Sequence, residues 1–327
     1  MTGRAQRVAI LATLVMAGLG SCSPAARIAP VVCPASPTTD QPGQLINVPA
    51  GRFLMGDDVY EDEGPPRFET VAAFRIDATE VTNARFARFV DETGYLTVAE
   101  RPVDPAQYPG MPAAALQPGS AVFRLGSERF DPGDPGTWWT FVPGASWRHP
   151  EGPGSDLNGR DFLPVVHIAL ADAQAYAQWA GRRLPTEIEW EWAARSADAA
   201  AGNASQQPSE ANTWQGVFPV RNTGRDGYDG AAPVGCFQAN SLGIHDMIGN
   251  VWEWTSDPYR QSRSRTVAPG EPGADPRQPG VAVGVIKGGS YLCAPNYCMR
   301  YRPGARQAQD LTLGASHVGF RTVAAMP

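Results

Sequence analysis

One stretch decides the fold class: Arg183-Leu184-Pro185-Thr186-Glu187-Ile188-Glu189-Trp190-Glu191-Trp192-Ala193-Ala194-Arg195. Thr186 and Glu189 form a capping-box pattern, in which the hydroxyl and the carboxylate each satisfy an exposed amide at the start of a helix. Trp190 and Ala193 then recur at helical spacing and supply a stripe that would face a core. The stretch predicts a short helix that starts at Thr186.

Two further helices are predicted toward the N-terminus. In the first, Asn83–Thr93, the residues Phe86 and Phe89 recur at helical spacing and Gly94 is positioned to end the helix. The second covers residues 171–180, with alanines along one face and a glycine directly after it. All three helices are short, so most of the chain must be strand or irregular backbone.

Short apolar runs bounded by turn residues predict strands. They lie at 46–48, 51–56, 71–76 and 281–286, and the first two flank a Pro-Ala-Gly turn. Residues 99–161 have no periodicity and are rich in Pro, Gly and Trp, so we interpret them as a long ordered loop region. With 35 glycines and 31 prolines in 327 residues, the chain is expected to form an α+β fold: one compact domain with low regular secondary structure and long ordered loops.

Composition narrows the function classes. Hydrophobic residues make up 43% of the chain and charged residues 18%, which is enough for a sizeable core. The formal net charge is −6 and no basic run interrupts the sequence, so no nucleic-acid partner is expected. Phosphate-binding loops, dinucleotide fingerprints and Gly-x-Ser-x-Gly elbows do not occur, which leaves nucleotide and serine-hydrolase functions without support.

The N-terminus has the features of an export signal. Arg4 and Arg7 precede an apolar run, residues 8–19, that is too short to span a bilayer and has the proportions of a secretory signal. The run ends in Leu19-Gly20-Ser21-Cys22, which resembles the lipobox of bacterial lipoproteins. We expect an exported protein of the cell envelope or periplasm, lipid-anchored through Cys22. Ordinary cleavage nearby, with Cys22 incidental, is the alternative.

These signals divide the chain into three parts. Residues 1–21 are expected to be a signal peptide, and residues 22–43 a proline-rich tether without periodicity. The folded domain is then expected to cover 44–327. Outside the leader, the pairing of Cys33 and Cys236 is left open by the sequence.

The densest cluster of aromatic and charged residues contains two cysteines. It reads Gly288-Gly289-Ser290-Tyr291-Leu292-Cys293-Ala294-Pro295-Asn296-Tyr297-Cys298, followed by three arginines within eight residues. The glycines allow close approach of a ligand, the Pro-Asn pair favours a turn that joins the sulfurs, and the arginines favour thiolates. Spacing alone leaves three interpretations: a local disulfide, which it favours, half of a zinc site, or a two-thiolate site for a soft ion such as Cu(I).

Two loop segments are rich in oxygen ligands. They are residues 212–228 and 246–253, and neither resembles an EF-hand. Turn-forming Asn and Asp that bond their own backbone are favoured by composition, and calcium binding is the alternative. The four histidines are dispersed, so each is interpreted as structural.

Several motifs together resemble the sulfatase-modifying-factor family. They are Pro49-Ala50-Gly51-Arg52-Phe53-Leu54-Met55-Gly56, Glu80-Val81-Thr82-Asn83, the opening stretch, Gly249-Asn250-Val251-Trp252-Glu253-Trp254 and Gly319-Phe320-Arg321. The resemblance covers residues 45–323, and the segments at 147–153, 214–219, 222–227 and 288–302 are similar to its formylglycine-generating members. It implies a formylglycine-generating-enzyme domain, a relative of the C-type-lectin fold.

The resemblance also implies an activity and a site. Cys293 and Cys298 would hold Cu(I), and the cysteine of a sulfatase Cys-x-Pro-x-Arg segment would complete the coordination. Dioxygen would oxidise that cysteine to Cα-formylglycine. Ser290 and Trp252 correspond to residues of the family's active-site cleft, and the chain is expected to act as a monomer.

Calcium is implied as a structural cofactor by the same resemblance. One site would use Asn212, Thr213, Asp226 and Tyr228, and a second would use Asp246, Gly249, Val251 and Glu253.

Two other functions remain as alternatives. An iron-dependent sulfoxide synthase requires a histidine cluster that this chain lacks, and a non-catalytic, lipid-anchored binding module would leave both cysteines without a role.

Overall fold

The fold was analysed in a computed structural model that describes residues 33, 43–107, 110, 112, 116–125, 130–196, 207–263 and 271–327. The predicted signal peptide lies outside the described residues, as does nearly all of the predicted tether. The described residues form three α-helices: α1 Asn83–Thr93, α2 Leu170–Trp179 and α3 Glu187–Ala194. Within the described part of the chain, no helix is long and apolar enough to cross a membrane.

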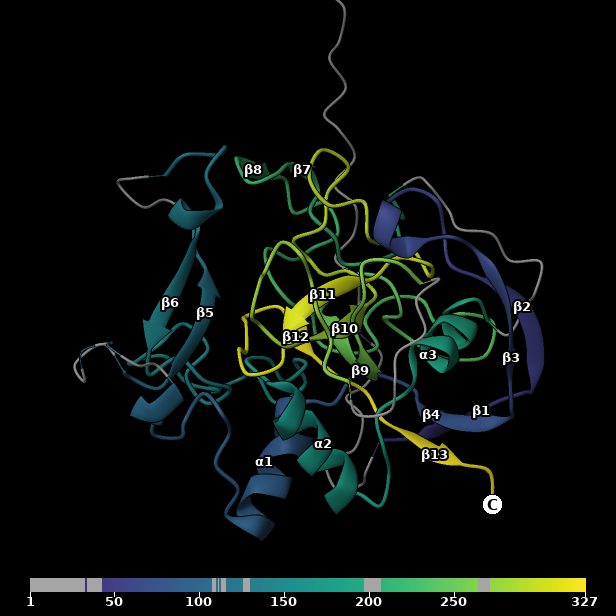
Figure 1. Cartoon of the computed structure of the whole chain (residues 1–327), viewed down its shortest axis with the longest axis horizontal. Helices are drawn as coiled ribbons and strands as arrows, with labels where there is room; N and C mark the ends of the chain where they lie inside the picture. Colours follow the sequence, from purple (N-terminus) through teal and green to yellow (C-terminus); the bar gives the residue numbers. More distant parts are fainter. Residues whose placement is uncertain are drawn as a thin grey trace, which may run out of the picture.

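Two sheets of the described residues have more than two strands (Figure 1). The first has the order β1 Leu45–Val48, β4 Phe74–Asp77 and β13 Val323–Ala325, and all of its pairs are antiparallel. The second has the order β11 Gln307–Asp310, β10 Val283–Lys287, β9 Trp252–Pro258 and β12 Val318–Gly319, and β12 runs parallel to β9. Both sheets therefore join the C-terminal segment to earlier parts of the chain.

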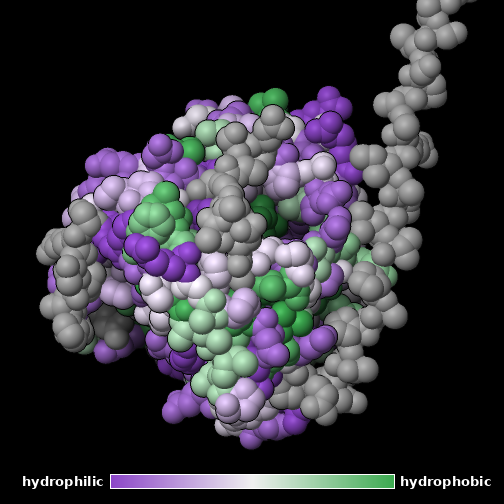
Figure 2. All heavy atoms as spheres, turned by 90° about the vertical axis from the view of Figure 1, so that its right-hand side faces the viewer, coloured by the Kyte–Doolittle hydropathy of each residue, from purple (hydrophilic) through white to green (hydrophobic). Residues whose placement is uncertain are grey.

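Three two-stranded hairpins surround these sheets. They are β2 Gly51–Met55 with β3 Arg67–Val71, β5 Gly119–Phe123 with β6 Trp139–Pro143, and β7 Gly216–Val217 with β8 Arg221–Asn222. The described residues also form short 3-10 helices, η1 Glu61–Glu63, η2 Pro105–Gln107 and η4 Pro135–Thr137. On the side that carries β2 and β3, hydrophilic surface predominates and hydrophobic residues form separate small patches (Figure 2).

Aromatic side chains fill the core. In the larger cluster, Phe86 of α1 packs against Trp147, Tyr176 of α2 and Phe320, with ring centroids 5.1 to 6.3 Å apart. A second cluster joins Trp190 and Trp192 of α3 to apolar residues of the β2–β3 hairpin and of the β1–β4–β13 sheet, and the Trp192 ring lies 5.1 Å from that of Phe53. α1 and α2 lie side by side in Figure 1 because both turn their apolar faces to the first cluster. This packing confirms the predicted α+β class.

The predicted helices are confirmed, and two loop and strand predictions are wrong. The predicted strand 71–76 is the end of β3 and the start of β4, separated at residues 72–73. The region 99–161 is not all loop, because it contains the β5–β6 hairpin. β1 and β2 do flank the Pro-Ala-Gly turn, but they pair with β4 and β3 and not with each other.

The N-terminus of α3 is capped as predicted. Thr186 Oγ1 accepts a hydrogen bond from Glu189 N at 3.2 Å, and Glu189 Oε2 accepts one from Thr186 N at 2.8 Å. Thr186→Ala should lower the free energy of unfolding by about 1 kcal/mol, because the Glu189 amide loses its acceptor, the Thr186 hydroxyl. Urea unfolding of Thr186→Ala and Thr186→Ser checks this. A Ser variant as unstable as the Ala variant would contradict the capping role.

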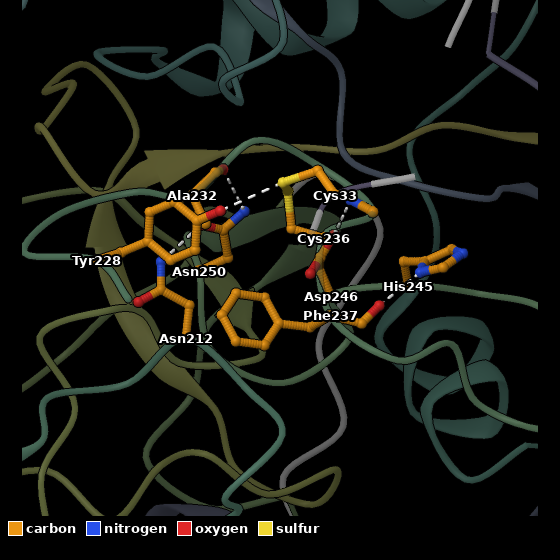
Figure 3. Close-up of a disulfide and its surroundings, with 10 residues drawn as sticks. Cys33, Asn212, Tyr228, Ala232, Cys236, Phe237, His245, Asp246 and Asn250 are labelled. Carbon is orange, nitrogen blue, oxygen red and sulfur yellow. Dashed lines mark hydrogen bonds between the residues drawn. A yellow bond between two sulfur atoms is a disulfide. The ribbon is translucent and has the colours of Figure 1, made fainter. Parts of the chain in front are cut away.

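Cys33 and Cys236 form a disulfide, which settles a pairing that the sequence left open (Figure 3). Cys236 lies in a small apolar cluster with Ala232 and Phe237, and the Tyr228 hydroxyl is 3.2 Å from the Cys33 sulfur. The bond joins positions 203 residues apart, so it ties the segment before β1 to the middle of the domain.

Loss of this disulfide is expected to destabilise the domain by about 2–4 kcal/mol, because a long loop of the unfolded chain is no longer closed. The measurement is urea unfolding of wild type and Cys236→Ser, each with and without dithiothreitol. The reductant should lower wild type to the level of the variant and leave the variant unchanged. Equal stability of oxidised wild type and variant would refute the structural role.

Candidate active site

A single cavity of 910 Å³ contains all four predicted catalytic residues. Cys293 and Cys298 lie on its wall, together with Ser290 and Trp252. Tyr297 and Arg300 of the cysteine segment also line the cavity, as do residues from distant parts of the chain, among them Tyr60, Trp139, Phe218 and His317. The structure therefore brings the motifs at 249–254 and 288–302 to one place.

The first cysteine is held by a tight turn after β10. Gly288 and Gly289 have φ values of +95° and +77°, a region that side chains other than glycine rarely adopt. A Cβ at Gly289 would lie 3.0 Å from the Arg300 carbonyl oxygen and 3.3 Å from Cys293 Sγ. Cys293 N donates to the Ser290 carbonyl at 2.9 Å, and the Cys293 carbonyl accepts from Trp214 N at 3.0 Å. The Cys293 backbone is thus fixed from both sides.

The two thiols are in direct contact and both are free. Their Sγ atoms are 2.7 Å apart, and Cys293 is fully buried whereas Cys298 is half-buried. Burial raises the pKa of the Cys293 thiol well above its usual value. The hydrogen bond from Cys293 lowers the pKa of Cys298, and the backbone amide and guanidinium of Arg300 act in the same direction. Of the two thiols, Cys298 is therefore the one that loses its proton more readily.

A cluster of acidic residues holds the segment after Cys298. Arg300 pairs with both oxygens of Asp62, at 3.0 and 3.1 Å, and its guanidinium lies 4.3 Å from the centre of the Tyr60 ring. The Tyr60 hydroxyl accepts a hydrogen bond from Met299 N at 3.2 Å. The segment around η1 therefore helps to position Cys298, although the two are more than 200 residues apart in the sequence.

Arg302 is the most buried of the three arginines that follow Cys298. It makes two bonds to the Glu63 carboxylate, at 2.7 and 2.8 Å, and a further ion pair with Asp57. Burial raises the pKa of Glu63 to about 7, against the opposing effect of Arg300. The pairing explains how an arginine with 1% exposure is accommodated.

Another part of the cavity wall is aromatic and includes His317, which was predicted from the sequence to be a structural residue. The His317 ring centroid is 4.7 Å from that of Trp139, and its carbonyl accepts from Trp252 N at 2.8 Å. Nδ1 of His317 is buried without a hydrogen-bond partner among the described residues. Burial lowers its pKa to about 3, so the imidazole is neutral at physiological pH. Nothing in its sequence context indicated that it lines the cavity.

The predicted calcium ligands lie close together in two loops. Asp226 accepts from Thr213 N at 3.2 Å and Tyr228 N at 3.3 Å, and the Asn212 carbonyl accepts from Asn250 N at 2.8 Å. In the second set, both Glu253 oxygens are bonded to Arg321, at 2.6 and 2.7 Å. Among the described residues, no group of three or more His, Cys, Asp or Glu side chains is arranged to hold a metal ion. Any calcium site here must use backbone carbonyls as well.

With this geometry in place, similarity to known proteins identifies the family. Residues 32–326 match the model of the sulfatase-modifying factor enzyme 1-like domain. The chain belongs to the sulfatase-modifying-factor family. It is 48% identical over 295 residues to the formylglycine-generating enzyme of Mycobacterium tuberculosis, covering 86% of this chain and 97% of that protein.

Other family members agree with this assignment. The formylglycine-generating enzyme of Bos taurus is 42% identical over 296 residues, which cover 86% of this chain and 75% of that protein. Among solved structures, PvdO from Pseudomonas aeruginosa aligns with a TM-score of 0.56 at 23% identity, over 87% of this chain and 95% of PvdO. At that identity PvdO supports the fold alone.

Proposed function

We propose that this family member is a formylglycine-generating oxidase, which converts the cysteine of a sulfatase Cys-x-Pro-x-Arg segment to Cα-formylglycine with dioxygen. The observation that carries the proposal is the pair of free thiols, Cys293 and Cys298, in contact on the wall of a large cavity. The similarity to named formylglycine-generating enzymes over 86% of the chain supports it.

The donor set fits Cu(I). Two adjacent thiols are soft ligands, and the described lining of the cavity offers no cluster of oxygen and nitrogen ligands that would favour a harder ion. Cys293 and Cys298 would hold the ion, and the hydrogen bond from Cys293 lowers the pKa of the Cys298 thiol. When bound, copper would supply the activation of dioxygen that side chains cannot provide.

The protein's own residues bind and orient the substrate. An extended polypeptide would enter the cavity, and its aromatic lining residues Trp139, Trp252 and Phe218 would keep water from the reacting Cβ. Oxidation of the CH2–SH group with one water gives an aldehyde, hydrogen sulfide, two protons and two electrons. Dioxygen accepts these protons and electrons as hydrogen peroxide, or forms water if a thiol reductant supplies two more of each.

Several further features belong to the same proposal. Export through residues 1–21 and a lipid on Cys22 would place the enzyme in the cell envelope, where the Cys33–Cys236 disulfide is stable. Calcium would support the two oxygen-rich loops, and the enzyme would act as a monomer. A non-catalytic binding module is not favoured, because such a role would not require two free thiols in one cavity.

Anaerobic titration with Cu(I) against a competing chelator tests the metal assignment. We expect one copper ion per chain in wild type and none in the Cys293→Ser and Cys298→Ser variants, because a single thiol is a weaker site. Copper binding that is unchanged in both variants would overturn the assignment, whether or not the enzyme is active.

A further inference from the structure

One strand that borders the active-site cavity has an unpaired edge. β11 is the outer strand of the β11–β10–β9–β12 sheet, and among the described strands it pairs with β10 alone (Figure 1). Three of its four residues, Gln307, Ala308 and Gln309, line the cavity that contains the two thiols. An edge strand presents backbone N–H and C=O groups that can pair with another extended chain. The free edge of β11 therefore lies where a polypeptide substrate would bind.

The pairing register shows which backbone groups of β11 point to the free edge. Leu311 N donates to the Ala282 carbonyl at 3.1 Å, in continuation of the register that pairs Ala308 with Val285. In an antiparallel pair, residues that bond to the partner strand alternate with residues whose N–H and C=O point the other way. The odd-numbered residues of β11 therefore bond to β10, and Ala308 directs both of its backbone groups away from it.

Ala308 is the position on this edge where donor and acceptor both lack a partner. The carbonyls before and after it along the edge are occupied: that of Arg306 accepts from the Arg300 guanidinium, and that of Asp310 accepts from Leu313 N at 3.4 Å. Ala308 is 5% exposed, and outside the β10 ladder its backbone makes no hydrogen bond with a described residue. Buried backbone groups are nearly always paired, so these two require a partner that enters through the cavity.

The side chains around Ala308 leave room for a second strand. The Ala308 methyl group packs in a small apolar cluster with Tyr259 and Val285. Gln307 and Gln309 point to the opposite face, because side chains alternate along a strand. Side chains stand roughly perpendicular to a sheet, so none of these three occupies the plane in which a second strand would pair.

The proposed substrate segment has the backbone that such pairing needs. In Cys-x-Pro-x-Arg, the residue before the proline is restricted to extended conformations, and the proline itself has no N–H to donate. A chain that adds to a sheet edge gains affinity from main-chain hydrogen bonds. Binding of this kind accepts any side chain at the two x positions.

We propose that the substrate segment binds by strand addition to β11, and that one of its residues other than the proline exchanges hydrogen bonds with the N–H and C=O of Ala308. β11 is joined to the cysteine segment, because Arg300, two residues after Cys298, bonds to the carbonyl directly before the strand. Strand addition would therefore position the segment relative to the two thiols. This inference rests on the proposed function, from which it takes the identity of the segment.

Binding of a peptide that cannot be oxidised tests strand addition separately from the reaction. The probe is a fluorescein-labelled sulfatase-type peptide with serine in place of its cysteine, and fluorescence anisotropy gives its affinity for the purified protein. Ala308→Pro should weaken binding by roughly ten-fold, because the proline ring replaces the free N–H and leaves the β10 ladder intact. N-methylation of the peptide backbone at one position should cause a similar loss in wild type and no further loss in Ala308→Pro.

Ala325→Pro is the matched control, on the edge of the other sheet. Val323 N donates to the Arg183 carbonyl at 2.8 Å, so by the same alternation Ala325 N also points away from β4. Ala325 is exposed and is not among the residues that line the cavity. Ala325→Pro should bind the peptide like wild type, and both proline variants should melt near the wild-type temperature.

Nuclear magnetic resonance of wild type, isotope-labelled on its alanine amides, gives a second measurement that needs no variant. Bound peptide should slow solvent exchange of the Ala308 amide by roughly ten-fold or more and leave that of Ala325 unchanged. This measurement decides the question if Ala308→Pro does not fold.

The outcomes separate strand addition from the proposed oxidation. Unchanged peptide binding by folded Ala308→Pro, or an Ala308 amide whose exchange the peptide does not slow, would overturn strand addition and leave the oxidation standing. The expected binding results without conversion of the cysteine peptide would support strand addition and contradict the oxidation. Wild type that neither binds nor converts the peptide would overturn both.

Discussion

Cys298→Ser and Cys293→Ser are each expected to reduce formylglycine formation by roughly a thousand-fold or more, because each removes one of the two thiols that would bind copper. The sulfurs are in contact, so neither can replace the other at its position. The measurement is the rate of aldehyde formation in a Cys-x-Pro-x-Arg peptide, followed by mass spectrometry with Cu(I) and air.

The control for this result is a measurement that the two variants are folded. Serine is close to cysteine in size, so both variants should keep a melting temperature near that of wild type. Cys236→Ser is a matched cysteine substitution outside the cavity, and it should retain activity at temperatures where it is folded. Undiminished oxidation by folded Cys293→Ser and Cys298→Ser would show that the site is elsewhere.

Arg302→Met is expected to lower the free energy of unfolding by about 3–5 kcal/mol, the largest stability effect in this set. Removal of the guanidinium leaves the fully buried Glu63 without its two-bond partner, and Asp57 loses an ion pair. Urea unfolding followed by tryptophan fluorescence gives the value directly.

An exposed arginine–glutamate ion pair with the same number of hydrogen bonds is the control that separates the effect of burial from the effect of charge. Arg183 also makes two bonds to a single glutamate, Glu189, at 2.6 and 2.7 Å, but its side chain is 50% exposed. Arg183→Met should therefore cost less than about 1 kcal/mol. Similar losses for the two variants would contradict the claim that burial makes the Arg302 pair important.

The helices were predictable because their signals are local. Thr186 and Glu189 are three residues apart, and Gly94 directly follows α1 with a φ of +67°, so neighbouring residues determine where these helices start and stop. The strands were less predictable, since β12 pairs with β9 and β13 with β4 across large sequence separations. The break between β3 and β4 carries no glycine or proline, so the sequence showed one strand there.

The site was predictable only where its residues form motifs. Cys293, Cys298, Ser290 and Trp252 lie in two short segments that resemble the family, and the structure places all four in one cavity. Tyr60 and His317 also line this cavity, but tertiary packing alone brings them there. The free state of the two thiols likewise could not be read from their spacing, which favoured a disulfide.

The most direct test of the account is conversion of the peptide by wild type. Purified protein loaded with Cu(I) is mixed in air with a sulfatase-derived Cys-x-Pro-x-Arg peptide, and the product is trapped with a hydrazine reagent and identified by mass spectrometry. We expect an aldehyde at the cysteine position, formed in air and not under nitrogen. A peptide that keeps its thiol in the presence of folded, copper-loaded protein and dioxygen would contradict the central claim.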